Sequence, residues 1–267
     1  QKKTKKQTGT PQSLGDHMMI DGLTDAYQKN TSMGIFAEET VKTYAFSKEE
    51  QDNFSLKSLE RANAAYKSRA FDSEIVPIII QTPAGQVELH RDENLDRATP
   101  EKIKQLKPAF LPDGTITAAT ASGIADGACA VFLMEEQEAN RAGLEIRAHI
   151  VGMCAHSHAP HQFTTAPIHA TKKLLEKIGW DVKDVDLFEV NEAFAVVPMA
   201  FMKELSVTSD KVNINGGACA IGHPIGSSGS RIVVTLLNAL EQQNKRRGVA
   251  TVCIGGGEAL AIAIEKP

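Results

Sequence analysis

From about residue 114 to its end, the sequence alternates short apolar runs with segments of helical periodicity. The apolar runs predict strands over residues 115–118, 128–134, 145–154, 185–190, 212–214, 249–254 and 259–264. The segments between them predict helices over residues 135–142, 165–178, 193–205 and 227–242. Such alternation is typical of an α/β protein in which helices cover the faces of a layered sheet.

The first 113 residues have a different pattern, which indicates an insertion of mixed elements. Ser47 followed by Glu50 is a capping box, because each residue can bond the backbone N–H of the other at the start of a helix. Residues 1–15 are polar and carry four lysines, so we expect them to be mobile. The expected elements are helices over 33–45 and 47–69, a hairpin over 74–89 and a short helix opened by the Thr-Pro pair at 99–100.

Charge and composition exclude several classes of protein. Lys plus Arg is 29 against 33 for Asp plus Glu, a net charge of −4, without the basic excess of a chain whose main partner is nucleic acid. The longest uncharged stretch, residues 212–230, is too rich in glycine to cross a membrane as a helix. None of the four cysteines forms a C-x-x-C pair, which argues against a disulfide framework and favours a reducing compartment, with the cytoplasm as the default.

The densest chemical signal is the glycine-rich segment N-I-N-G-G-A-C-A-I-G-H-P-I-G-S-S-G over residues 213–229. A predicted strand ends in it and a predicted helix follows, so backbone N–H groups at the helix start could face a developing negative charge. Glycines permit close backbone approach, and Pro224 fixes the chain after His223. His223 is therefore a candidate catalytic residue. The alternative is a packed connection in which His223 is merely hydrogen-bonded.

Two further segments follow predicted strands. Asn191 and Glu192 place an amide and a carboxylate at the carboxyl edge of the sheet, where α/β proteins commonly have their sites; alternatively, Asn191 only caps a helix. Cys253 ends another strand and precedes three glycines, whose N–H groups can form an oxyanion hole. The alternative for Cys253 is inert packing, the commoner role of a buried cysteine.

Together these segments resemble the thiolase family. N-E-A-F-A at 191–195, G-G-A-x-A-x-G-H-P-x-G-x-S-G at 216–229 and C-I-G-G-G at 253–257 occur in the family's order, and A-S-G-x-x-D-G-A at 121–128 resembles another of its segments. The resemblance implies a layered α-β-α-β-α fold, incomplete at the N-terminus. The implied parts are a loop domain over 1–113, the end of the N-terminal domain over 114–143 and the C-terminal domain over 144–267.

The resemblance implies reversible acyl transfer, as thiolytic cleavage of a 3-ketoacyl-CoA or Claisen condensation of acetyl-CoA. The family's nucleophilic cysteine is expected upstream of Gln1, so this chain alone is expected to be inactive. His223 would activate that thiol, and Cys253, as a thiol of low pKa, would act as general acid and base. A water held by Asn191 would bind the enolate oxygen together with His223, and the Gly255 N–H would bind the tetrahedral intermediate.

A groove for the pantetheine arm of coenzyme A is also implied. CoA and acyl-CoA are then the substrates and partners, no separate cofactor is needed, and the family implies a homodimer or homotetramer. Phe163 stands where many relatives have Met, which leaves the preferred acyl length open. The cysteines at 129, 154 and 219 are expected to be structural. The expected groove residues are Met33, Ser122, Phe163, Ala193 and Phe194.

A non-catalytic CoA-binding or assembly subunit of thiolase fold is the alternative function. The chain would resemble one because none of its residues occupies the position of the family's nucleophile. A decarboxylating ketoacyl synthase would require a second histidine where Cys253 stands, so the sequence argues against that enzyme.

The histidine-rich segment H-S-H-A-P-H at 156–161 raises the question of a metal site. Histidines at i and i+2 on a strand face the same way, so His156 and His158 could share an ion. No carboxylate or cysteine is placed to complete the ligand set. The sequence therefore predicts a hydrogen-bonded or solvent-facing histidine cluster and no metal.

Overall fold

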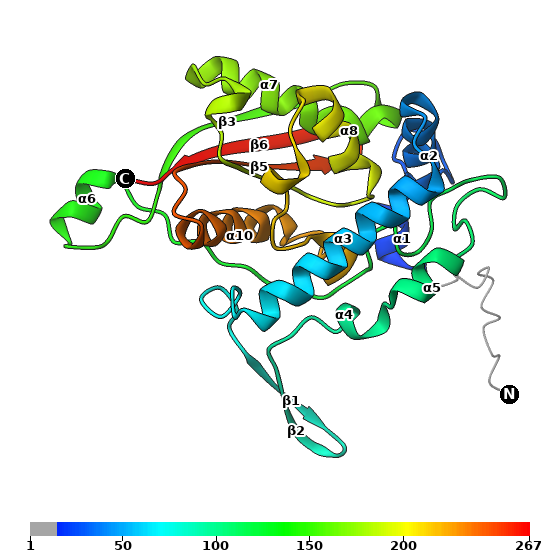
Figure 1. The fold of residues 1–267 in the computed structure, drawn as a ribbon, viewed down its shortest axis with the longest axis horizontal. Helices are drawn as coiled ribbons and strands as arrows, with labels where there is room; N and C mark the ends of the chain where they lie inside the picture. The colour runs from blue at the N-terminus through cyan, green and yellow to red at the C-terminus, as the bar shows by residue number, and fades with distance from the viewer. Residues whose placement is uncertain (1–14) are drawn as a thin grey trace, which may run out of the picture.

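A four-stranded sheet lies at the centre of the structure, a computed structural model that describes residues 15–267 (Figure 1). Its strand order is β3 (His149–Ser157), β6 (Glu258–Glu265), β5 (Arg247–Ile254) and β4 (Leu187–Val190). The β3–β6 and β6–β5 pairs are antiparallel, and β4 pairs with β5 in parallel. Four expected strands are thereby confirmed, the first beginning later than predicted. The lead-in predicted to be mobile, up to residue 14, lies outside the described residues.

Helices cover both faces of this sheet (Figure 1). On one face lie α7 (Ala166–Ile178) and α8 (Val196–Leu205), and on the other lies α10 (Ser228–Gln242). Successive residues of a strand therefore enter different cores: Val249 packs with α7 and α8, and Ala250 packs with α10. Burial on both faces explains the apolar runs of the sequence, and the expected α/β layering is confirmed.

The segment before residue 114 contains the mixed elements that the sequence predicts. Between α2 (Met33–Tyr44) and α3 (Lys48–Lys67), the Glu50 N–H donates to the Ser47 hydroxyl and the Ser47 N–H donates to the Glu50 carboxylate, which is the expected capping box. The hairpin projects from the body of the molecule (Figure 1). The other elements here are α1 (His17–Asp21), β1 (Ile78–Thr82), β2 (Gly85–Leu89), α4 (Asn94–Arg97) and α5 (Pro100–Gln105).

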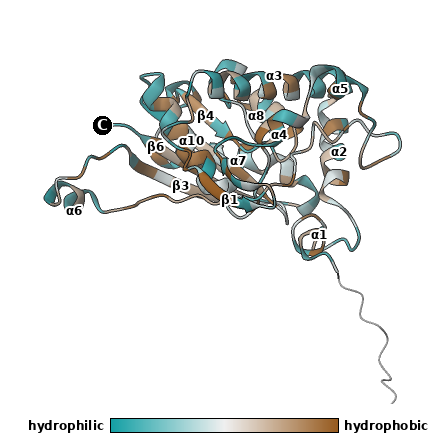
Figure 2. Cartoon of the chain, turned by 90° about the horizontal axis from the view of Figure 1, so that it is seen from below, coloured by the Kyte–Doolittle hydropathy of each residue, from teal (hydrophilic) through white to brown (hydrophobic). Residues whose placement is uncertain are grey.

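The strands expected over residues 115–118 and 128–134 do not form, and both predictions are wrong. In the first, the N–H groups of Thr115 and Ile116 donate to the Glu38 carboxylate, at 2.8 Å each, instead of to a strand. In the second, Phe132 is 80% exposed. A strand needs a hydrogen-bonding partner, and no strand within residues 15–267 pairs with this segment. The segment 128–134 leads to α6 (Glu136–Arg141), which projects from the body of the molecule (Figure 2). The helix predicted over residues 135–142 is thereby confirmed.

The strand expected over residues 212–214 is also wrong, for a local reason. Val212 forms a single parallel bridge with Phe188, after which Asn213 adopts a left-handed conformation with φ of 47°. The Asn213 side chain then continues the pairing: its Oδ1 accepts from the Val190 N–H and its Nδ2 donates to the Val190 carbonyl, both at 2.8 Å. A side chain thus replaces backbone at this edge of β4.

The remaining elements are short. They are the helix α9 (Ala218–Ile221) and 3₁₀ turns at Pro160–Thr165, Val182–Asp184 and Ser209–Lys211. Among the residues that the structure describes, no helix combines the length and apolar character needed to cross a membrane.

Candidate active site

The predicted catalytic residues gather where β4 and β5 end. Because these strands are parallel, their carboxyl ends lie at the same edge of the sheet. Asn191 follows β4 directly, and its N–H donates to the Thr251 carbonyl of β5 at 3.0 Å. Cys253 lies two residues farther along β5. The amide and the thiol predicted from separate motifs therefore sit on neighbouring strands at one edge.

His223 reaches this edge from the glycine-rich loop. Its backbone N–H donates to the Gly123 carbonyl at 2.8 Å, and Gly222 before it has φ of 98°, a conformation that favours glycine. The Asn191 Nδ2 group lies 3.4 Å from His223 Nε2. The loop and the end of β4 thus meet through these two side chains.

The hydrogen bonds of Ser228 fix the tautomer of His223. The Ser228 hydroxyl donates to the Pro224 carbonyl at 3.1 Å, so it accepts from His223 Nδ1–H at 2.6 Å. The lone pair is then on Nε2, the nitrogen that faces Asn191. Burial, with a smaller contribution from Arg231, lowers the pKa of His223 to about 4. His223 is therefore a neutral base at neutral pH, and Ser228 is a positioning residue that the sequence analysis missed.

Asn191 offers one unused acceptor in this site. It is 1% exposed, and its Oδ1 atom has no hydrogen-bond partner among the described residues. A buried amide oxygen without a partner is costly, so a small polar molecule bound there would be stabilised. This geometry fits the water-holding role that the resemblance implies.

The Cys253 thiol differs from the expectation. The family resemblance implies a thiol of low pKa, but Cys253 is 8% exposed in the core that also contains Met33 and Phe163, and burial raises its pKa to about 12. Apolar surroundings disfavour the thiolate because they cannot solvate its charge. Cys253 is thus a protonated thiol in this structure, which suits a proton donor.

Gly255 lies in the turn between β5 and β6, beside Met33. A Cβ at Gly255 would lie 3.6 Å from Met33 Cε, and Gly256 and Gly257 have φ of 90° and 85°. Gly255 itself is exposed. The backbone N–H proposed for the oxyanion hole is therefore on an accessible turn at the same edge as Cys253.

The residues expected to line the coenzyme A groove lie near one another, and three of them are buried. The Ser122 N–H donates to the Ala193 carbonyl at 3.0 Å. The rings of Phe163 and Phe194 pack edge to face with centroids 6.3 Å apart, and both are buried, as is Met33. Pairing of 120–122 with 193–195 also explains why α8 begins at Val196, later than the predicted helix.

Glu192, the other charged group of the N-E-A-F-A motif, has a structural role. Its carboxylate accepts from the Ser58 hydroxyl at 2.8 Å, from Asn213 Nδ2 at 2.9 Å and from the Cys219 N–H at 3.0 Å. Burial raises its pKa, and these bonds oppose that shift. The carboxylate therefore ties the glycine-rich loop to α3 and β4, with its oxygens already used.

Gly217 is required by the packing of this carboxylate. A Cβ at Gly217 would lie 2.4 Å from the Glu192 Cδ atom, so we expect Gly217→Ala to lower the free energy of unfolding by about 2 kcal/mol. Denaturant unfolding followed by circular dichroism measures this change. The matched control is Gly229→Ala in α10, where a Cβ meets nothing within 4 Å and stability should be unchanged or slightly raised. Equal stability of the two variants would contradict the packing role.

The three other cysteines lie outside this arrangement. All are free thiols, and none is more than partly exposed. The Cys219 thiol lies 3.8 Å from the Glu192 carbonyl, and burial raises its pKa well above the usual value. Burial also raises the pKa of Cys129. These settings are consistent with the structural roles expected for them.

Comparison with known families matches both parts of the chain. The family profile of the thiolase C-terminal domain matches residues 144–266, and that of the thiolase N-terminal domain matches residues 2–137. An acetyl-CoA acetyltransferase of Chromobacterium violaceum is 47% identical over 256 residues, which cover 95% of this chain and 65% of that protein. The chain thus spans somewhat less than two thirds of this relative's length.

Two solved structures share the fold. The acetyl-CoA acetyltransferase of Bacillus anthracis superposes with a TM-score of 0.92 at 38% identity, over 100% of this chain and 68% of that one. The Acat5 thiolase of Ascaris suum, solved with coenzyme A, gives a TM-score of 0.85 at 41% identity, over 96% of this chain and 65% of that one. The likeness therefore covers sequence and fold together.

Proposed function

This chain belongs to the thiolase family, and on that premise we propose that it provides the base, the proton donor and the oxyanion-binding groups of an acyltransferase acting on acyl-CoA. The fold is the α/β thiolase fold. The proposal rests on the geometry of His223. Its unprotonated Nε2 lies beside Asn191, and its Nδ1–H donates to the Ser228 hydroxyl. A neutral imidazole so held can accept a proton from a thiol.

We propose that the nucleophile is a cysteine in the part of the family's fold that lies outside these 267 residues. His223 Nε2 takes the proton of that thiol, and the thiolate attacks the ketone carbon of a 3-ketoacyl-CoA. The carbon–carbon bond then breaks, and its electron pair forms the enolate of acetyl-CoA. His223, now protonated on Nε2, donates to the enolate oxygen together with a water held by Asn191.

Cys253 completes the first half of this reaction. Its protonated thiol gives a proton to the enolate carbon, which releases acetyl-CoA and leaves Cys253 as a thiolate. That thiolate then takes the proton of incoming CoA, which attacks the acyl-cysteine to form a tetrahedral intermediate. The Gly255 N–H donates to the oxyanion of this intermediate. Its collapse releases a shortened acyl-CoA and expels the nucleophilic cysteine as a thiolate, which takes its proton back from His223 Nε2. The same steps in reverse condense two acetyl units.

The remaining proposals concern partners and setting. CoA and acyl-CoA are the substrates and no separate cofactor takes part. A homodimer or homotetramer is proposed on the family's precedent. Four free thiols fit a reducing compartment, and the cytoplasm is proposed on that ground.

Cleavage of acetoacetyl-CoA by free CoA tests this function. In the complete native protein that contains this chain, we expect the absorbance of acetoacetyl-CoA to fall only when both thioester and CoA are present. Omission of CoA is the control for plain hydrolysis. A folded protein that binds CoA but gives no turnover would contradict the catalytic proposal and favour a non-catalytic CoA-binding or assembly subunit.

A further inference from the structure

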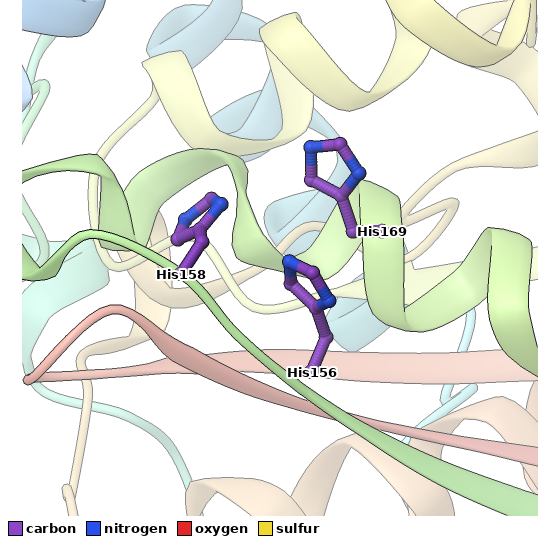
Figure 3. Close-up of side chains that lie close together, drawn as sticks. All are labelled: His156, His158 and His169. Atoms are coloured by element: carbon purple, nitrogen blue, oxygen red, sulfur yellow. The ribbon is translucent and has the colours of Figure 1, made fainter.

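Three histidines that the proposed reaction does not use lie close together where α7 packs on the end of β3 (Figure 3). His156 is near the end of β3, His158 follows that strand, and His169 is in the first turn of α7. Their ring centroids are 4.8 to 5.5 Å apart, and one ligand nitrogen from each lies within 4.8 Å of the other two. The strand spacing in the sequence pairs only the first two, because His169 comes from another element.

The packing of α7 on β3 fixes this geometry. Alternation along the strand places His156 and His158 on the same side. At Gly152 of the same strand, a Cβ would lie 2.7 Å from Ile178 Cγ2, so strand and helix approach each other closely. His169 therefore projects over the two strand histidines from a supported position.

The two ring nitrogens of His156, a partly buried residue, lack hydrogen-bond partners among the described residues. Both atoms, Nδ1 and Nε2, are themselves buried. An unpaired buried nitrogen carries a desolvation cost, which a bound ion would remove by coordination. This observation is independent of the clustering itself and points to a ligand.

His158 is oriented as ligating histidines commonly are. Its Nε2 lies 2.7 Å from the Gln162 carbonyl, to which it must donate because a carbonyl only accepts. The lone pair is then on Nδ1. A hydrogen bond from the non-ligating nitrogen to a carbonyl fixes the tautomer and the ring orientation in metal sites.

We propose that His156, His158 and His169 bind one divalent transition metal ion of the zinc class. Three imidazoles without a carboxylate or thiolate suit Zn²⁺, Co²⁺, Ni²⁺ or Cu²⁺ and not Ca²⁺ or Mg²⁺. Metal–nitrogen bonds of about 2.0–2.1 Å in a tetrahedral arrangement separate the ligand nitrogens by about 3.3 Å. Side-chain rotation must therefore close the cluster by about 1.5 Å at most. His169 is exposed, so it can rotate and leave a fourth position for water.

Nearby charges affect the strength of this site. Burial and then the charge of Lys173 lower the pKa of His156, and burial and then His158 lower the pKa of His169. The Lys173 and Lys172 ammonium groups oppose a cation, although Lys172 has a partner in Glu204 at 3.8 Å. The affinity should therefore be weaker than that of a site with a carboxylate ligand.

The proposed metal site is connected to the proposed active site through the chain and one backbone hydrogen bond. The chain between His158 and His169 contains Phe163, and the His158 N–H donates to the Gly257 carbonyl at 3.0 Å. A bound ion would join β3 to α7 and hold both ends of this segment. We therefore expect metal binding to raise thermal stability, and the catalytic residues themselves do not touch the ion.

The test uses the complete native protein, freed of its affinity tag and stripped with a chelator. Zn²⁺ is titrated by calorimetry, and Co²⁺ by its visible absorption, whose intensity reports tetrahedral coordination. We expect the unaltered protein to bind one ion per chain. The variants His169→Ala and His158→Ala should bind this ion at least tenfold more weakly. Zn²⁺ should raise the melting temperature of the unaltered protein more than that of His169→Ala. His90→Ala, an exposed histidine after the hairpin, is the matched control and should bind as the unaltered protein does.

Two results would overturn the proposal. One is no saturable binding of Zn²⁺ or Co²⁺ by the stripped protein. The other is equal affinity in His169→Ala and the unaltered protein, which would place the ion elsewhere, for example on cysteines. His169→Gln is a second variant that keeps the size and polarity of the side chain, so a folding defect in His169→Ala would not obscure the result.

Discussion

His223→Ala in the complete native protein is expected to lower kcat for acetoacetyl-CoA cleavage by at least about 10³-fold while the fold stays intact. General base catalysis contributes about 10² to 10⁴. A lost donor to the enolate oxygen costs a further 10² or more. Within residues 15–267 the side chain bonds only Ser228 and Asn191, so its removal should leave the melting temperature and circular dichroism nearly unchanged. Steady-state kinetics measure the loss.

The pH profile and two further variants make this prediction specific. Because the pKa of His223 is lowered to about 4, the base stays neutral as pH falls from 7 to 5. Protonation of His223 should therefore lower kcat/KM only when the pH approaches 4. Ser228→Ala removes the acceptor of Nδ1–H and should reduce kcat less than His223→Ala does. His90→Ala should be fully active. Near-normal turnover in His223→Ala would refute the role of base.

Much of the fold follows from local signals in the sequence. The capping box of Ser47 and Glu50 and the hairpin at 74–89 form as predicted, because each is set by residues adjacent in the chain. The sequence also indicates the glycine-rich loop and Asn191 as candidates, because sites in α/β proteins lie at the edge where strands end. In these segments the structure favoured by neighbouring residues is also the structure found in the fold.

The errors arise where a distant partner decides the structure. Residues 128–134 have the apolar pattern of a strand, but periodicity does not say whether another strand lies beside them. The expected role of Cys253 implies a low pKa, whereas its burial in the core that also contains Met33 and Phe163 raises the pKa. His169 lies on a different element from His156, and only the packing of α7 on β3 brings them together.

One short segment shows why the site as a whole could not be assembled from its motifs. The Thr120 carbonyl accepts from the Ala195 N–H at 2.8 Å, and the Gly123 carbonyl accepts from the His223 N–H at 2.8 Å. Residues 120–123 therefore hold the N-E-A-F-A motif and the histidine loop together by backbone bonds. Backbone hydrogen bonds do not depend on a particular pattern of side chains. The sequence therefore indicates the separate motifs but not that they are in contact.

Cys253→Ala is expected to separate the two halves of the reaction. Protonation of the enolate carbon, and removal of the same proton in reverse, depend on this thiol, so exchange of the acetyl-CoA methyl hydrogens with deuterated water should fall by about 10³-fold or more. Formation of the acyl-cysteine from acetyl-CoA should fall less, because the CoA thiolate is a far better leaving group than a carbanion. His223→Ala should lose both activities, because both need the activated nucleophile.

The measurement is nuclear magnetic resonance of acetyl-CoA for exchange, with mass spectrometry of the protein for the acyl-cysteine. Cys154→Ala on β3 is the matched control, because it also removes a thiol from the sheet but lies away from the β4–β5 edge. It should keep both activities. Cys253→Ser tests the chemistry, since a buried hydroxyl fills most of the space but is a much weaker acid than a thiol. If Cys253→Ser or Cys253→Ala keeps normal exchange, the proton donor is another group, and the raised pKa of Cys253 reports only its burial in the core.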